Sequence, residues 1–81
     1  MTKTLRTKQH IFLCEQLKKA RLDASLTQTG LAERLGKTQS YVAKVETHER
    51  RLDVVEFVAW MKACCGIKHS KGILYALADI K

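Results

Sequence analysis

Apolar residues recur along most of this chain three and four positions apart, which is the spacing of amphipathic α-helices. The sequence contains no proline, which would break a helix, and no stretch that alternates apolar and polar residues as a strand does. The pattern predicts an all-α fold of five helices, at about residues 8–24, 27–35, 38–47, 53–65 and 70–80.

Short polar side chains mark where several of these helices begin, because their oxygens can accept hydrogen bonds from the first free backbone N–H groups. Thr27 and Thr38 are the expected caps of the second and third helices, and Ser70 is the expected cap of the last. Asp53 and Glu56 have the spacing of a capping box at the start of the fourth helix. The predicted boundaries therefore rest on cap chemistry as well as on periodicity.

Two glycines are placed where helices end. Gly36 can adopt the left-handed conformation that ends the second helix, and Gly66 is expected to end the fourth. Because the turn around Gly36 is short, the second and third helices form a closely connected pair.

The apolar faces of the helices define the expected core. On the first helix this face holds Ile11, Leu13, Leu17, Ala20 and Ala24, with Arg21 beside them. Phe57 and Trp60 on the fourth helix are interpreted as core or dimer-contact residues, because helical spacing accounts for them without a ligand. The last helix carries a further apolar stripe of Ile73, Leu77 and Ile80. Such a stripe can close the core or meet a second copy, and we expect it to form a dimer interface.

Length and charge restrict the class of protein. A chain of 81 residues supports one compact domain, expected at residues 9–81, after a flexible basic arm at residues 1–8. Lys3, Arg6 and Lys8 in this arm either reach a groove of a binding partner or form a solubilising tail. The 15 Lys and Arg against 8 Asp and Glu give a net charge of +7, which favours nucleic acid or an anionic membrane surface as partner.

The sequence disfavours a membrane protein and an enzyme. It contains no 18-residue apolar run and no secretory signal pattern, so a cytoplasmic location is expected. The basic residues are spread over several helices instead of lining one face, which disfavours a membrane surface as partner. The histidines are scattered, and Cys14, Cys64 and Cys65 lack metal-ligand or disulfide spacing, so we expect reduced, mostly buried thiols and no catalytic residue, metal or other cofactor.

Residues 27–46 carry the most informative pattern in the chain. Two short helical patterns are joined by the turn at Gly36, and the second begins with the polar pair Gln39 and Ser40. This arrangement is typical of a helix-turn-helix, in which one helix is held clear of the domain so that it can enter the major groove of DNA. The pattern therefore predicts binding to double-stranded DNA.

Several short motifs occur in a fixed order along residues 10–67. They are LKKAR in the first helix, TQ and LA..LG in the second, and TQS.V.K.E in the third. In these motifs the chain resembles the XRE family of bacterial and phage regulators, which includes lambda-type repressors and Cro proteins. The resemblance implies a five-helix, lambda-repressor-like domain that acts as a homodimer on a short inverted repeat, as a small transcriptional regulator and more specifically a repressor.

The resemblance also implies which residues meet the DNA. Base contacts are expected from one face of helix 38–47, which carries Gln39, Ser40, Ala43 and Lys44. Gln39 is the strongest candidate, because a glutamine amide can pair with N6 and N7 of adenine at once. Contacts to the DNA backbone are expected from Gln28, Lys37, Thr38, Arg50 and Arg51. For each of these side chains the alternative is an ordinary solvated position.

Two further positions follow from the same resemblance. The family pairs the positions of Arg21 and Glu46 in a partly buried salt bridge that holds the recognition helix against the body of the domain. His48 stands where the family usually has glycine, so we expect a positive φ at this residue, which histidine tolerates better than most side chains.

Two other functions remain as alternatives. The domain could be an antitoxin that holds a toxin or another protein partner and regulates its own operon. It could also be the controller of a restriction-modification operon. Neighbouring genes would distinguish these alternatives from a simple repressor.

Overall fold

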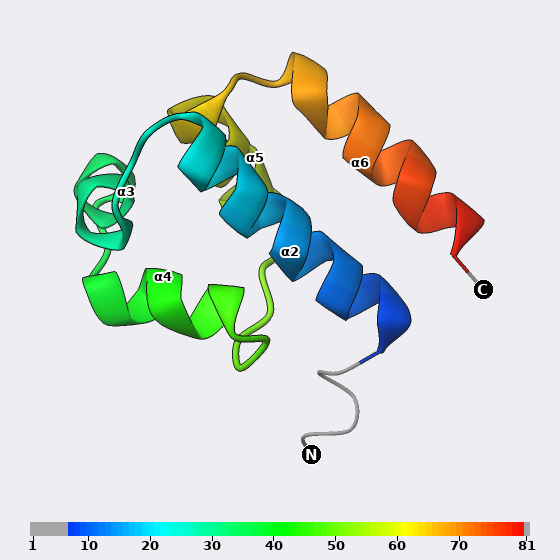
Figure 1. Ribbon diagram of the computed structural model, residues 1–81, viewed down its shortest axis with the longest axis horizontal. Helices are drawn as coiled ribbons and strands as arrows, with labels where there is room; N and C mark the ends of the chain where they lie inside the picture. Colours follow the sequence, from blue (N-terminus) through cyan, green and yellow to red (C-terminus); the bar gives the residue numbers. More distant parts are fainter. Residues whose placement is uncertain (1–6, 81) are drawn as a thin grey trace.

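The computed structural model describes residues 7–80 and confirms the all-α fold with five helices. They are α2 (Lys8–Asp23), α3 (Gln28–Leu35), α4 (Gln39–Glu46), α5 (Val54–Cys64) and α6 (Lys68–Asp79), and no strand occurs within residues 7–80. Helix α2 lies between α4 and α6 and packs against both, while α3 contacts α4 and α5 (Figure 1). No helix in this part of the chain is long and apolar enough to cross a membrane.

The predicted N-terminal caps of three helices are present. The hydroxyl of Thr27 accepts a hydrogen bond from the N–H of Gly30 at 2.9 Å, and that of Thr38 accepts one from the N–H of Tyr41 at 3.1 Å. At the start of α5, Asp53 and Glu56 form the expected reciprocal capping box. These local interactions explain why the boundaries of α3, α4 and α5 agree closely with the sequence prediction.

The two ends of the domain compare differently with the prediction. Helix α2 begins at Lys8, as the periodicity predicted, and is capped by the hydroxyl of Thr7, so Lys8 belongs to this helix and not to the arm expected at residues 1–8. The remaining arm residues named in the prediction, Lys3 and Arg6, lie outside the described residues. Helix α6 begins at Lys68 without a side-chain cap, and Ser70 lies buried inside it with no hydrogen-bond partner for Oγ within residues 7–80.

The helix ends and the loop after α4 use left-handed backbone. Gly36 has φ +67° and Gly66 has φ +90°, as expected for residues that end a helix. His48 also has a positive φ, of +69°, which confirms the expectation for this residue. The chain can therefore turn sharply on both sides of α4.

The core forms around Trp60, which is fully buried. Its indole N–H donates a hydrogen bond to the carbonyl oxygen of Leu17 at 3.0 Å, so that the polar edge of the ring is satisfied inside the domain. Phe57 is also buried, which confirms a core role for both aromatic residues. The side chains around them come from every described helix: Leu17, Ala20, Leu31, Ala32, Val42, Val45, Met61 and Ile73.

The buried face of α2 is rotated from the predicted one. Its buried residues are His10, Cys14, Leu17, Ala20 and Arg21. Ile11, Leu13 and Ala24, which were expected on this face, are only half-buried. The prediction was correct for Leu17, Ala20 and Arg21, but it missed Cys14 and polar His10, which also face inward.

The apolar stripe of α6 mainly closes the core. Ile73 is 8% exposed and belongs to the core cluster, and Leu77 is half-buried against it. Ile80 follows the last residue of α6 and is half-buried as well. Ile73 is therefore mostly covered by its own domain, and the dimer interface expected of this stripe stays a prediction.

We predict that His48→Gly is more stable than His48→Ala by about 1 kcal/mol. A Cβ atom is strained in left-handed backbone, and only glycine removes that strain. Both variants remove the imidazole, so the comparison isolates the backbone term. Equal midpoints in urea denaturation, followed by circular dichroism, would contradict a strained turn at this residue.

Candidate nucleic-acid interface

Helix α4 has one face in the core and the other in solvent. Val42 and Val45 are fully buried, whereas Gln39, Ser40 and Lys44 are exposed. The fourth residue predicted to contact bases, Ala43, is half-buried on the same side of the helix. The structure thus places these four residues together on the accessible side of α4.

A buried ion pair joins α4 to α2. Nε of Arg21 lies 2.6 Å from Oε2 of Glu46, and Nη2 of Arg21 lies 3.1 Å from Oε1. The two side chains are only 8% and 3% exposed. The hydrogen bond to Glu46 raises the pKa of Arg21, and a third bond, from Nη1 to the carbonyl oxygen of Leu26, at 2.7 Å, fixes the guanidinium further. Bidentate geometry of this kind holds the two helices at a defined distance and orientation.

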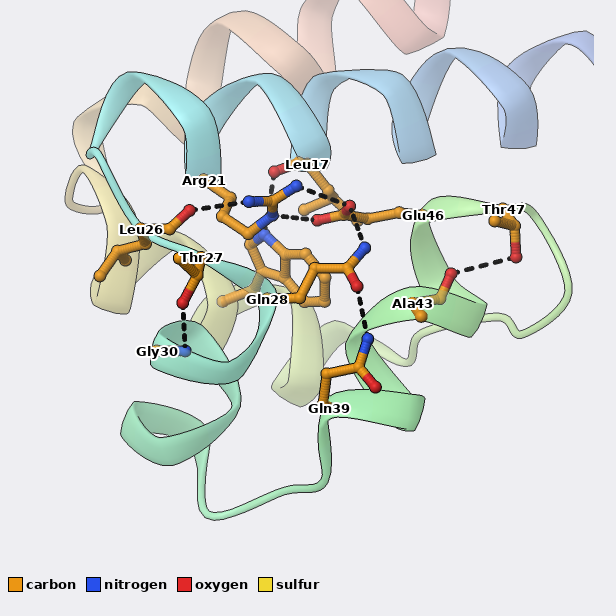
Figure 2. Close-up of polar contacts among 11 residues, drawn as sticks. Leu17, Arg21, Leu26, Thr27, Gln28, Gly30, Gln39, Ala43, Glu46 and Thr47 are labelled. Atoms are coloured by element: carbon orange, nitrogen blue, oxygen red, sulfur yellow. Dashed lines mark hydrogen bonds and ion pairs between the residues drawn. The ribbon is translucent and has the colours of Figure 1, made fainter.

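Two glutamines extend this ion pair to the surface (Figure 2). Nε2 of Gln28 donates to Oε1 of Glu46 at 3.1 Å, and Nε2 of Gln39 donates to Oε1 of Gln28 at 2.6 Å. A continuous set of polar contacts therefore runs from Arg21 in the core to Gln39 at the exposed tip of α4. The family resemblance implied the pair of Arg21 and Glu46, but the hydrogen bonds that join Gln28 and Gln39 to it were not foreseen.

Cations lie at both ends of α4. Lys37 and Thr38 precede the helix and are exposed. Arg50 follows it, with Nη2 3.3 Å from Oε2 of Glu56 and Nη1 2.8 Å from the carbonyl oxygen of Arg51. Arg51 is exposed next to the start of α2. The predicted backbone-contact residues therefore surround the accessible face of α4, while the proposed dimer residues of α6 lie on the far side of α2 (Figure 1).

Tyr41 was placed on the inner face by the sequence, and its further contacts were missed. It is half-buried, and its hydroxyl donates a hydrogen bond to Oε2 of Glu56 at 3.2 Å. Burial, followed by the nearby charge of Glu56, raises the pKa of Tyr41 to about 12, so the phenol stays neutral at physiological pH. No sequence spacing could reveal this contact, because only the fold brings the start of α5 beside α4.

The histidines and cysteines show no metal site within residues 7–80, since no three potential ligands converge there. Nε2 of His10 lies 3.6 Å from Sγ of Cys14, and burial lowers the pKa of His10 and raises that of Cys14 to about 11. Cys64 is half-buried and Cys65 is exposed, so the expectation of mostly buried thiols is correct for Cys14 alone. Cys64 is the last residue of α5, and Cys65 follows it where the chain turns into solvent.

These features define a helix-turn-helix DNA-binding domain. A family model described as Helix-turn-helix matches residues 17–64. Among solved structures, the chain is similar to an XRE-family like protein from Pseudomonas syringae pv. tomato str. DC3000, with 39% identity and a TM-score of 0.78 over 95% of this chain and 92% of that chain. No curated protein matches the chain.

The chain belongs to the XRE-type helix-turn-helix family. Membership implies DNA binding and a role as a transcriptional regulator, and proteins of this family are typically not enzymes.

We predict that Arg21→Ala lowers the free energy of unfolding by about 3–5 kcal/mol, because it leaves the carboxylate of Glu46 buried without a compensating positive charge. Lys19→Ala is the matched control, since Lys19 pairs with Asp23 at the surface, where both side chains are more than 60% exposed. Lys19→Ala should change the free energy of unfolding by no more than about 0.5 kcal/mol. A wild-type melting temperature for Arg21→Ala would contradict the structural role of the pair.

Proposed function

We propose that this protein is a transcriptional repressor that inserts α4 into the major groove of an operator half-site. The observation that carries this proposal is the exposed row of polar side chains on α4, whose opposite face is locked in the core by Val42, Val45 and the Arg21–Glu46 pair. A helix held in this way can enter the groove as a preorganised unit. The net charge of +7 favours association with DNA at any sequence.

Gln39 is the proposed reader of an adenine. Its amide nitrogen has two N–H groups, and the bond to Gln28 uses one of them. The second N–H and the carbonyl oxygen remain for N7 and N6 of the base. The contact to Gln28 therefore orients the amide of Gln39 without preventing a bidentate base contact.

The other base contacts follow from position and chemistry. Ser40 can donate to or accept from a base edge, and Lys44 can donate to a guanine. Ala43 is small enough to let the groove approach closely and can touch a thymine methyl group.

Phosphate contacts are proposed for residues around α4. They are Gln28, Lys37, Thr38, Arg50 and Arg51. Four of these are at or beyond the ends of α4, where they can contact the DNA strands that border the groove. The N-terminal end of α4 adds a partial positive charge next to Lys37 and Thr38. Such contacts position the domain and supply affinity that depends on salt.

A homodimer on an inverted repeat completes this proposal. Val54, Val58, Ile67 and Leu74 border an apolar groove of about 390 Å³ between α5 and α6, and Val54 is 77% exposed. A second copy seated here would cover this apolar surface, to which Leu77 of the predicted stripe also contributes. Two-fold symmetry of the protein would then match two-fold symmetry of the operator.

The same exposed surface supports a second candidate function. Val54 and Val55 are both 77% exposed, which is unusual for valines at the start of a helix that packs on a core. An antitoxin would use such a surface to hold its toxin, and a controller of a restriction-modification operon would use it to dimerise. A toxin gene or a methylase gene beside the coding sequence would favour the respective alternative over a simple repressor.

We predict different effects for Gln39→Ala and Arg51→Ala on binding sites selected from random duplex DNA. Gln39→Ala should relax the preference at one base position, at a cost of about 1–3 kcal/mol for the preferred duplex. Arg51→Ala should weaken all duplexes equally and lower the salt slope by about one unit. If Gln39→Ala selects the same sites with the same affinity as the wild type, α4 does not read DNA as proposed.

We predict that Val54→Gln raises the dissociation constant of the homodimer about ten-fold or more, because each of two copies loses apolar contact. Leu22→Gln is the control, since Leu22 is 55% exposed on α2 and does not line the groove. Both substitutions are neutral in charge. Sedimentation equilibrium measures the constant, and a wild-type protein that stays monomeric with and without its operator would contradict the dimer.

A further inference from the structure

The aromatic ring of Tyr41 lies close to two cationic side chains next to α4. Nζ of Lys37 lies 5.4 Å from the centroid of the Tyr41 ring, and Cζ of Arg50 lies 4.7 Å from it. Both distances are within the range of cation–π attraction. Lys37 precedes α4 and Arg50 follows it, so this ring gathers one cation from each end of the helix.

The ring itself is held in place from two sides. Its hydroxyl donates to Glu56, which also accepts the backbone N–H of Asp53 at 3.0 Å in the capping box of α5. The centroid of the buried Trp60 ring lies 6.5 Å from the centroid of the Tyr41 ring. Tyr41 therefore has a fixed position, and its ring offers a second contact for Arg50, which also binds Glu56, and a contact for the long side chain of Lys37.

Arg50 keeps hydrogen-bonding capacity for a further anion. The guanidinium has five N–H groups, and its contacts to Glu56 and to the carbonyl oxygen of Arg51 involve only Nη1 and Nη2. The pair with Glu56 is partly exposed, with the Arg50 side chain 42% accessible, so it adds little to stability. Its main effect is to restrict Arg50 before any ligand arrives, which lowers the entropy lost on binding.

We infer that Tyr41 is a positioning residue for DNA binding, whose ring preorganises Lys37 and Arg50 to bind phosphates of the DNA backbone. The inference rests on the proposed function, because it takes duplex DNA as the ligand. In this role Tyr41 touches neither base nor phosphate. It determines how strongly the cations at both ends of α4 contribute to DNA affinity.

The test is the salt dependence of binding to a selected duplex, measured by fluorescence anisotropy for three variants. Tyr41→Phe keeps the ring and should keep the wild-type slope. Tyr41→Leu keeps an apolar side chain next to Trp60 but removes the ring, so affinity should fall several-fold and the slope by about one unit, since each phosphate contact contributes about 0.9. Pentafluorophenylalanine at position 41 keeps the ring shape but reverses its charge distribution, and should behave like Tyr41→Leu.

A protein that lacks the cations of Lys37 and Arg50 distinguishes an effect of Tyr41 on these cations from an effect on folding. In Lys37→Met/Arg50→Met protein, the changes at position 41 should leave the salt slope unchanged. A wild-type slope for both the leucine and the pentafluorophenylalanine variants would overturn the inference, as would an equal loss in the cation-free background. A wild type that binds no duplex preferentially contradicts the proposed function itself, whereas normal wild-type binding with unaltered variants contradicts only the role of Tyr41.

Discussion

The buried ion pair between Arg21 and Glu46 is the interaction on which the rest of the interface depends. Removing two charges from water is costly, and a pair of this kind contributes little net stability compared with apolar residues of the same volume. Its effect is geometric, because two hydrogen bonds fix α4 relative to α2. Through Gln28 the same carboxylate also determines the orientation of Gln39 at the exposed tip of the helix. A single charge buried in the core therefore controls the position of a side chain that lies in solvent.

The cations at the two ends of α4 are arranged by a second, partly exposed set of contacts. Tyr41 links Lys37 and Arg50 to the capping box of α5, so the start of one helix influences the charge around another. The two sets of contacts have different effects. The buried pair of Arg21 and Glu46 fixes the polar tip of α4, and the ring of Tyr41 holds positive charge at the ends of this helix. Under the proposed function, we expect sequence preference and salt-dependent affinity to change independently.

Features set by neighbouring residues could be predicted from the sequence, and features set by contacts between distant segments could not. The caps at Thr38 and Asp53 follow from chemistry within one helical turn, and the structure confirms them. The contact between Tyr41 and Glu56 depends on how α5 packs beside α4, which no local pattern specifies. The burial of Ile73 shows the same difference. An apolar stripe predicts that its residues are buried, but the packing of α6 determines whether the core of the same chain or a second chain covers them. The residues proposed for DNA contact came from the family resemblance, and their connection through hydrogen bonds became visible only in the fold.

The most direct test of this account is an NMR titration of isotope-labelled protein with its selected duplex. The account predicts that the largest chemical-shift changes occur at the side-chain amides of Gln28 and Gln39 and at the backbone amides of residues 38–44. The ion pair behind them should persist, so the guanidinium resonance of Arg21 should remain protected from exchange with water. Changes confined to α5 and α6, with α4 unaffected, would contradict the claim that this anchored helix is the surface that meets DNA.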